Sequence, residues 1–433
     1  MHIMPPDLLT ARDPTEVICH RDGAAVTVGR FLAQAEALAA RLPEHGHAVN
    51  ICADRYAALV GFAAALWRGH PTLLGARPGA AAGYAGAYIL ADAPQPGAPL
   101  PVIRVDFASG GATPAPPAIP AGRIAAIAFT SGSTGAPTAH AKPWGSLVLG
   151  AAAAAARFGL RAQDGRPTSL VATVPPQHMY GFETTLMLPL HAAVAIHAGA
   201  SFFPSDVLAA LNSVPPRRIL VTTPLHLRVL LAEGRRPPAL SAVISATAPL
   251  SRDIAEAVER DWGAPTLEIY GATEAGSMAS RRSATEDDWL PYDGIAISPG
   301  LAAIPGLGAI PLSDALEPAG DGRFRLLGRI ADLVKLGGKR ASLAELNRVL
   351  ATVPGVEDGV FLAPHDLEGN PAARLAAIVV APGLSATDIL GALRGRLDPA
   401  FLPRRLEMVT ALPRDQLGKL PRQALARLVR DDR

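Results

Sequence analysis

Residues 123–137 read RIAAIAFTSGSTGAP, and this stretch indicates the fold most directly. Its first half, residues 123–129, is a compact apolar run that predicts a buried strand. Its second half, from Thr130 to Pro137, is a loop of hydroxyl residues and glycines, whose N–H and O–H groups can surround phosphate oxygens. A strand that leads into such a loop indicates an α/β domain with a candidate phosphate site. Taken alone, the loop could also be a flexible linker.

This loop differs from the phosphate-binding loop of the Walker A type. No Gly-Lys-Ser/Thr follows Gly132 or Gly135 at the spacing that a Walker A loop requires. Pro137 also removes a backbone N–H at the point where the helix of such a loop would continue. The missing lysine therefore excludes a GTPase switch built on that loop.

Short apolar runs alternate with helical patterns on both sides of this stretch. Strands are predicted near residues 49–53, 170–174, 218–222 and 242–245, and helices at residues 27–42 and 56–67. Strands that alternate with helices are typical of an α/β domain. We therefore predict a large N-terminal α/β domain with layered sheets.

The pattern changes beyond residues 320–328, where a Gly-Asp-Gly turn leads into a short strand. Helices are predicted at residues 343–352 and 385–397, strands at residues 359–363 and 375–381, and a last helix after Pro421. This arrangement predicts a small α+β domain. The expected division is residues 1–327 for the large domain and residues 328–433 for a small, mobile C-terminal domain.

Composition excludes several classes of protein. The chain has 433 residues, of which 49% are hydrophobic, and this is enough apolar material for a large core. Forty Lys and Arg against 38 Asp and Glu leave a net charge of only +2, which argues against a general nucleic-acid binder. The two cysteines, Cys19 and Cys52, could form one bridge but neither a disulfide framework nor a metal cluster.

No segment predicts export or a membrane span. The N-terminal residues lack the basic and apolar regions of a signal peptide. The most membrane-like stretch, residues 147–156, is far shorter than the roughly 20 residues that a bilayer needs. We therefore expect a cytoplasmic protein and interpret this stretch as a buried or surface helix.

Three further motifs follow the phosphate loop. Residues 269–276 read IYGATEAG, where an aromatic ring, a hydroxyl and a carboxylate could stack a base, contact a phosphate and hold Mg²⁺. Residues 328–340 read GRIADLVKLGGKR, and residues 412–422 read LPRDQLGKLPR. Each of the three alone could be a surface turn or a solvated run of charges.

The order of the four motifs resembles that of the acyl-adenylate-forming superfamily. This superfamily includes acyl- and aryl-CoA synthetases, adenylation domains of peptide synthetases, and luciferases. The resemblance covers about residues 123–433, and the chain is shorter than typical members, mostly before the phosphate loop. It implies the adenylate-forming fold, ATP and Mg²⁺ as cofactors, and two half-reactions. A carboxylate and ATP give an acyl-adenylate and pyrophosphate, and a thiol then displaces AMP.

The resemblance also assigns roles to individual residues of the large domain. The loop that holds the β- and γ-phosphates corresponds to Thr130, Ser131, Gly132, Ser133, Thr134 and Gly135. Tyr270 matches the adenine-stacking aromatic residue, and Gly271 follows it in the same motif. Thr273 matches a phosphate contact and Glu274 the Mg²⁺ ligand.

Other assignments concern the acid, the ribose and the catalytic lysine. Thr247 lies in a segment, residues 245–250, that borders the adenine and the acyl group and usually contains glycines. His178, in VPPQHMYGFE (residues 174–183), would lie near the carboxylate or gate the thiol tunnel. Asp314 and Arg329 match the two ribose contacts. Lys419 matches the lysine that bridges the carboxylate and the α-phosphate during adenylation.

Two positions depart from the family pattern. The phosphate loop usually ends Pro-Lys-Gly, whereas here Pro137 is followed by Thr-Ala-His-Ala-Lys, so Lys142 or His140 could supply the missing charge or could form a solvent-exposed pair. The hinge position, commonly Asp or Lys, is Ala331. Rotation of the small domain is still expected, but its pivot is not assigned.

The sequence leaves the acid and the thiol open. His178 and Tyr180 are compatible with an aryl acid, and Met179 is equally compatible with an acyl chain. Ten basic and five acidic residues lie between Arg394 and Arg433, and this excess could meet CoA phosphates, an acidic carrier protein, or only solvent. We expect an AMP-forming acid–thiol ligase with CoA as the acceptor. The alternatives are direct loading of an acyl carrier protein and a degenerate, non-catalytic nucleotide- or acyl-binding protein.

Overall fold

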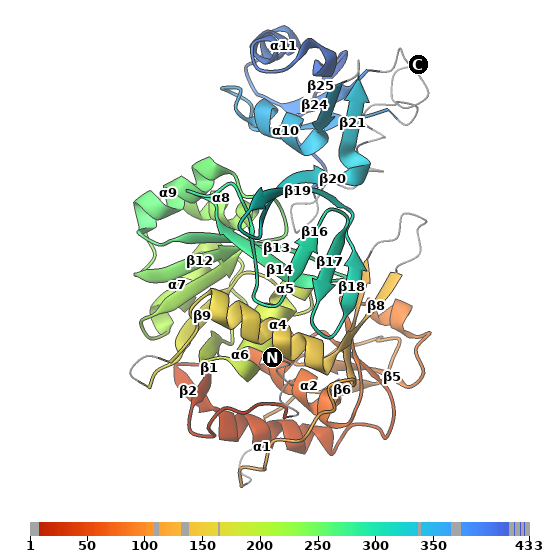
Figure 1. Cartoon of the computed structure of the whole chain (residues 1–433). Coiled ribbons are helices and arrows are strands. Elements are labelled where there is room, and N and C mark those ends of the chain that lie inside the picture. Colours follow the sequence, from red (N-terminus) through yellow and green to blue (C-terminus); the bar gives the residue numbers. More distant parts are fainter. Residues whose placement is uncertain are drawn as a thin grey trace. The chain divides into compact units, whose positions relative to one another are not determined.

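The computed structural model describes residues 8–107, 112–130, 138–162, 165–336, 339–364 and 374–414, together with residues 420, 425 and 428. The chain folds into two compact units. One consists of Met1–Ala296 with Ala302–Ile310, and the other of Ile297–Leu301 with Pro311–Arg433. Figure 1 shows the elements of both units. The functional boundary between residues 327 and 328 stays a prediction.

A nine-stranded sheet forms the centre of the N-terminal unit (Figure 1). Its order is β15-β14-β13-β12-β11-β9-β10-β1-β2, and the six strands from β13 to β1 run parallel. The strands are β1 (Val17–Arg21), β2 (Ala24–Thr27), β9 (Thr168–Ala172), β10 (Val194–His197), β11 (Arg218–Thr222), β12 (Leu240–Ser245), β13 (Thr266–Ala272), β14 (Gly276–Arg282) and β15 (Leu290–Pro291). The predicted α/β architecture is therefore confirmed, and its central strands are parallel.

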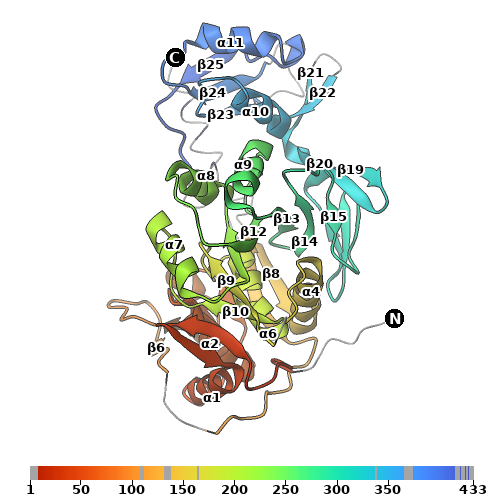
Figure 2. The same cartoon turned by 90° about the vertical axis from the view of Figure 1, so that its left-hand side faces the viewer.

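Each central strand of this sheet contributes side chains to two cores, because successive residues of a strand point to opposite faces. Val171, Leu220 and Val243 face a core shared with α7 (Pro204–Ser213), α8 (Pro224–Ala232) and α9 (Arg252–Trp262). Their neighbours Leu170 and Ile219 face the main core on the other side. The three helices lie along one face of the sheet (Figure 2).

A second, six-stranded sheet has the order β6-β5-β3-β4-β7-β8. Its strands are β3 (His47–Asn50), β4 (Thr72–Leu74), β5 (Ala87–Ala91), β6 (Val102–Arg104), β7 (Ile124–Thr130) and β8 (Thr138–Pro143). All pairs are parallel except the β7–β8 hairpin. The predicted strand of residues 123–129 is thus β7, and it ends at Thr130.

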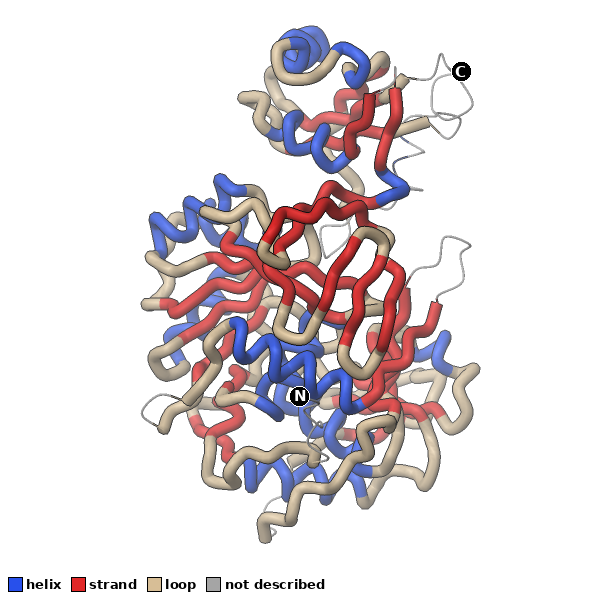
Figure 3. Tube along the Cα trace, viewed as in Figure 1, coloured by secondary structure: helices blue, strands red, loops and turns tan. Residues whose placement is uncertain are grey.

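Helices fill the space around the main core (Figure 3). Thr27 caps α1 (Val28–Ala39) and Asp54 caps α2 (Arg55–Trp67), each by accepting a backbone N–H with its side chain. Helix α2 is buried over almost its whole surface, as expected of a helix that is apolar all round. The remaining helices are α3 (Pro78–Ala81), α4 (Trp144–Arg157), α5 (Met179–Phe182) and α6 (Leu188–His191), with the π-helical turn η1 (Glu183–Met187) between the last two.

The C-terminal unit is the predicted α+β fold. Its hairpins are β19 (Asp314–Gly320) with β20 (Arg323–Arg329), and β21 (Leu333–Leu336) with β22 (Lys339–Ser342). Its sheet consists of β23 (Asp358–Leu362), β24 (Ala376–Val380) and β25 (Arg405–Met408), packed on α10 (Leu343–Ala351) and α11 (Ala386–Arg394). Short turns η2 (Ile330–Asp332) and η3 (Pro399–Phe401) join these elements. Strands β16 (Ala296–Ser298), β17 (Leu301–Ile304) and β18 (Gly308–Pro311) form a separate small sheet, most of whose residues belong to the N-terminal unit. The helix predicted after Pro421 lies largely outside the described residues.

Two smaller expectations are also settled. Cys19 and Cys52 are both free and buried, so they form no bridge. Residues 147–156 belong to α4, which is half-buried along its length. In the described part of the chain, no helix combines the length and the apolar character that crossing a bilayer would require.

Candidate functional site

The strand order of the nine-stranded sheet reverses between β9 and β11. The chain leaves β9 for β10 on one side, whereas it leaves β11 for β12 on the other side. Ligands of open α/β sheets bind at such a switch point, outside the carboxyl ends of the strands. Two hydroxyl groups meet there, because Thr173 Oγ1 and Thr222 Oγ1 lie 2.9 Å apart. This edge is therefore the candidate site.

His178 follows β9 and lies beside this edge. It is the N-terminal capping residue of α5, and its Nδ1 accepts the backbone N–H of Tyr180 at 3.3 Å. The neutral ring then carries its proton on Nε2. The Tyr180 hydroxyl donates to the carbonyl of Ile244 at 2.9 Å, so α5 is bonded to strand β12.

The His-x-x-Gly spacing has a steric reason. A Cβ atom on Gly181 would lie 1.9 Å from the carbonyl oxygen of Pro175. Only glycine therefore allows α5 to fold back against the segment that leads to it. This close approach holds His178 next to the end of β9.

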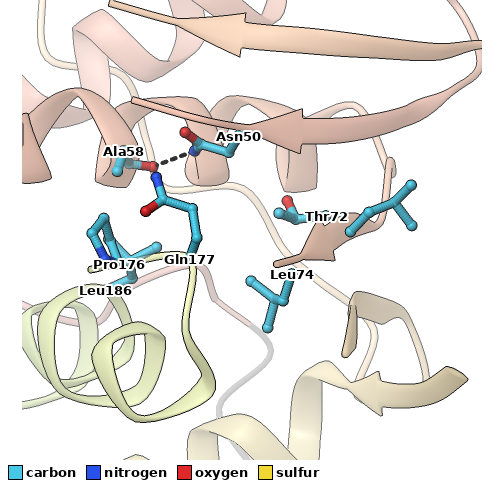
Figure 4. Close-up of a pocket in the computed structure, with 8 residues that line it drawn as sticks. Asn50, Ala58, Thr72, Leu74, Pro176, Gln177 and Leu186 are labelled. Atoms are coloured by element: carbon cyan, nitrogen blue, oxygen red, sulfur yellow. Dashed lines mark hydrogen bonds between the residues drawn. The ribbon is translucent and has the colours of Figure 1, made fainter. Parts of the chain in front are cut away.

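A small pocket lies where this segment meets the six-stranded sheet. Pro176, Gln177 and Leu186 form one side, and residues from the ends of β3 and β4 form the other (Figure 4). Asn50 Nδ2 donates to the Ala58 carbonyl at 2.8 Å, and Gln177 Nε2 donates to the Cys52 carbonyl at 2.7 Å. The second of these bonds joins the His178 segment to the residues that follow β3, and the first joins β3 to α2.

Thr247 follows β12 at the same edge, and its backbone is strained. Its φ of 81° lies in the left-handed region, which β-branched residues rarely adopt. Its Oγ1 is buried and has no hydrogen-bond partner among the residues that the structure describes. Strain of this kind is concentrated at functional sites. A threonine thus adopts here a conformation that suits the glycine of the family pattern.

The YGATE motif forms the end of β13 and the turn into β14. Tyr270 is 6% exposed and packs on Trp289, with the ring centroids 5.7 Å apart. Gly271 lies beside it, exposed, on the last part of β13. Thr273 and Glu274 lie in the turn, both half-buried. The motif therefore ends at the same edge as His178 and Thr247.

The phosphate loop is described only at its first residue. Thr130 Oγ1 lies 3.0 Å from His140 Nε2 across the β7–β8 hairpin. The predicted contacts Ser131, Gly132, Ser133, Thr134 and Gly135 lie outside the described residues. Lys142 is 1% exposed, and its Nζ donates to the Glu274 carbonyl at 2.6 Å. The expectation of a solvent-exposed pair is therefore wrong for Lys142.

The predicted ribose contacts belong to the C-terminal unit. Asp314 and Arg329 are directly paired at the open end of the β19–β20 hairpin. Ala331 lies in the 3₁₀ turn η2, directly after this hairpin. Lys419 lies outside the described residues, so its role stays a prediction.

The residues present fit one Mg²⁺ ion held together with a nucleotide. Mg²⁺ is usually bound by one or two carboxylates and by substrate phosphates. Within the described ranges, no group of three His, Cys, Asp or Glu residues could hold a metal ion by itself, so the nucleotide phosphates would have to supply further ligands. The carboxylate of Glu274, half-buried in the turn after β13, is a hard oxygen donor of the kind that Mg²⁺ takes.

Three polar residues near the site were not predicted. Arg55 is 3% exposed and donates to the carbonyls of Ala172 and Val174 on the segment leading to His178. The Glu183 carboxylate accepts from the N–H and the hydroxyl of Ser277. For Glu183 the sequence signal is a single charged residue in an apolar run, whereas Arg55 directly follows Asp54 and carries no such signal.

The chain is similar to known proteins over most of its length. The model of the AMP-binding enzyme family matches residues 87–301. A 4-coumarate–CoA ligase from Rhodobacter capsulatus is 30% identical over 305 residues, which cover 68% of this chain and 74% of that ligase. A probable 2-succinylbenzoate–CoA ligase from Mycobacterium tuberculosis is 26% identical over 338 residues, covering 70% and 84%.

The fold is likewise similar to that of a solved structure. The o-succinylbenzoate coenzyme A synthetase MenE from Bacillus subtilis, in complex with AMP, superposes with a TM-score of 0.79. The sequence identity is 19%, and the match covers 99% of this chain and 98% of that chain. The expected adenylate-forming fold is thereby confirmed.

Proposed function

Because the chain belongs to the family of AMP-binding enzymes that form acyl-adenylates, we propose that it is an AMP-forming acid–CoA ligase acting on an aromatic carboxylic acid. The observation that carries this proposal is the convergence of the motifs. His178, Thr247 and Glu274 follow three parallel strands of one sheet, and the carboxyl ends of parallel strands share an edge. The aromatic substrate class rests on the 4-coumarate and succinylbenzoate ligases among the relatives.

The first half-reaction joins two anions. A carboxylate oxygen attacks the α-phosphorus of ATP, the bond from that phosphorus to the bridging oxygen breaks, and pyrophosphate leaves. Catalysis of such a step consists mostly of positioning and of charge neutralisation. Mg²⁺, when bound, neutralises phosphate charge, and Glu274 would hold it. Thr130 and Thr273 would contact phosphate oxygens, with Tyr270 against the adenine.

The second half-reaction releases the product. The CoA thiolate attacks the acyl carbonyl, the bond from the carbonyl carbon to the AMP oxygen breaks, and AMP leaves. His178 would border the carboxylate, where its Nε2–H could donate to an acyl oxygen. Asp314 and Arg329 would bind the ribose hydroxyls. Carrier-protein loading and a cytoplasmic location stay predictions.

Acid-dependent release of pyrophosphate from Mg²⁺·ATP tests this function. The protein is assayed with aryl, hydroxyaryl and fatty acids, each with and without CoA. We expect release with a subset of the aryl acids and faster turnover with CoA. Glu274→Gln should slow release at least about tenfold, because the proposed Mg²⁺ carboxylate is lost.

The other outcomes discriminate between the alternatives. Turnover that requires a phosphopantetheinylated carrier protein and ignores CoA would overturn the acceptor assignment. Release with fatty acids alone would overturn the aryl class. ATP binding without release for any acid would favour a non-catalytic nucleotide-binding protein.

A further inference from the structure

A buried lysine lies directly beneath the turn that carries the proposed Mg²⁺ ligand. Lys142 is on β8, in the six-stranded sheet, whereas Glu274 follows β13 in the nine-stranded sheet. The Lys142 ammonium donates to the backbone carbonyl of Glu274 at 2.6 Å. Burial lowers the pKa of Lys142 to about 8, and attraction to the carboxylates of Glu183 and Glu274 opposes this shift. The ammonium is therefore a fixed internal group and not a mobile phosphate contact.

A half-buried carboxylate holds the other side of the same turn. Glu183 begins the π-helical turn η1, a form of helix that is frequent at functional sites. Its Oε1 accepts the backbone N–H of Ser277 at 3.0 Å, and its Oε2 accepts the Ser277 hydroxyl at 2.5 Å. A Cβ atom on Gly276, whose φ is 86°, would lie 2.6 Å from Oε1. Glycine is thus required for the carboxylate to reach the strand.

These contacts fix the β13–β14 turn at both ends. Lys142 holds the carbonyl at position 274, and Glu183 holds the amide and the hydroxyl at position 277. Lys142 comes from the six-stranded sheet and Glu183 from the π-helical turn η1, so the turn is tied to parts of the chain that are distant in sequence. Charges near the core are weak evidence for stability, because desolvation of the buried ammonium offsets its attraction to the carboxylates. Their effect is geometric, since the held turn carries Thr273 and Glu274.

We propose that Lys142 and Glu183 are positioning residues that hold the carboxylate of Glu274 where Mg²⁺·ATP binds. This inference rests on the proposed function, because it takes Glu274 as the Mg²⁺ ligand. Partners of a metal ligand commonly change metal affinity by about 10–100-fold when they are replaced. Replacing a residue that contributed only to stability would change the affinity for ATP to the same extent with and without Mg²⁺.

The test compares ATP binding with and without the metal. The dissociation constant of ATP is measured by calorimetry, once with excess Mg²⁺ and once in EDTA, for the full-length protein and its variants. Lys142→Met should weaken binding of Mg²⁺·ATP about tenfold or more and leave binding of metal-free ATP within about twofold. Lys142→Arg should retain most of the Mg²⁺ effect. Lys339→Met, which removes an exposed ion pair with Asp398, is the control and should match the unaltered protein.

A double variant separates positioning from folding. Lys142→Met leaves Glu183 without its nearby cation, so adding Glu183→Gln should raise the urea midpoint of unfolding again. Binding of Mg²⁺·ATP should stay weak in the double variant, because neither end of the turn is held by a charge. Recovery of Mg²⁺·ATP binding together with stability in the double variant would overturn the proposal. The proposal would also be overturned if Lys142→Met weakened ATP binding equally in Mg²⁺ and in EDTA.

The positioning role and the proposed function can fail separately. The binding readout needs no turnover, so a Mg²⁺-specific loss in Lys142→Met would stand even where no acid releases pyrophosphate. Conversely, pyrophosphate release with an unchanged Mg²⁺ effect in Lys142→Met would retain the function and overturn the positioning role. No binding of ATP to the unaltered protein would overturn both.

Discussion

Replacing Lys419 by alanine is expected to slow acyl-adenylate formation by about 10²–10³-fold, the usual cost of removing one preorganised electrostatic contact from a transition state. The carboxylate and the α-phosphate are both anionic, and a cation between them offsets their repulsion as they approach. Thioester formation from supplied acyl-adenylate should change far less, because no such pair of anions has to meet. The measurement is the rate of each half-reaction separately.

The Lys339→Ala protein is a suitable control for this experiment. Lys339 is 57% exposed and pairs with Asp398, so its loss removes a lysine charge from the same unit at little cost. Equal losses in the two half-reactions of Lys419→Ala would contradict the assignment, because they would indicate general damage to the site.

Replacing Arg55 by methionine is expected to lower the free energy of unfolding by about 3–5 kcal/mol, since each buried carbonyl left unpaired costs about 1–3 kcal/mol. The guanidinium donates to the carbonyls of Gly199, Ala172 and Val174. Burial lowers the pKa of Arg55 to about 10. Methionine fills a similar volume but donates to none of the three. Urea unfolding at neutral pH measures the change.

Two further variants make this result specific. Arg55→Lys retains a charge but fewer donors, so its loss should be intermediate. Arg41→Met removes a half-exposed ion pair with Asp106 and should change the free energy of unfolding by less than about 1 kcal/mol. A loss below about 1 kcal/mol in Arg55→Met would contradict the structural role given to its guanidinium.

The layered α/β fold could be predicted because its strands and helices follow apolar periodicity. The run at residues 218–222 coincides with β11, and the pattern at residues 27–42 contains α1. The strand expected at residues 49–53 instead ends at Asn50, because the Asn50 side chain accepts the backbone N–H of Cys52 at 3.2 Å and turns the chain. The apolar pattern does not reveal such local side-chain contacts, so it could not predict where this strand ends.

The site was predictable only as far as its motifs follow strands. His178, Thr247 and Glu274 each come directly after an apolar run, so parallel pairing brings them to one edge. The charges that support this edge carry no such signal. Arg55 contacts carbonyls that are 117 and 144 residues away in sequence, and Lys142 contacts one that is 132 residues away. Their partners are set by how α2 and β8 pack against the nine-stranded sheet and the residues that follow its strands.

The most direct test of the ligase function follows one oxygen atom. The protein is incubated with Mg²⁺·ATP, CoA and an aryl acid whose carboxylate carries oxygen-18, and the AMP is analysed by mass spectrometry. The oxygen that attacks the α-phosphorus stays on it when the thiol displaces AMP, so the account predicts AMP that carries one labelled oxygen. Unlabelled AMP, or ADP with labelled inorganic phosphate, would contradict an acyl-adenylate intermediate.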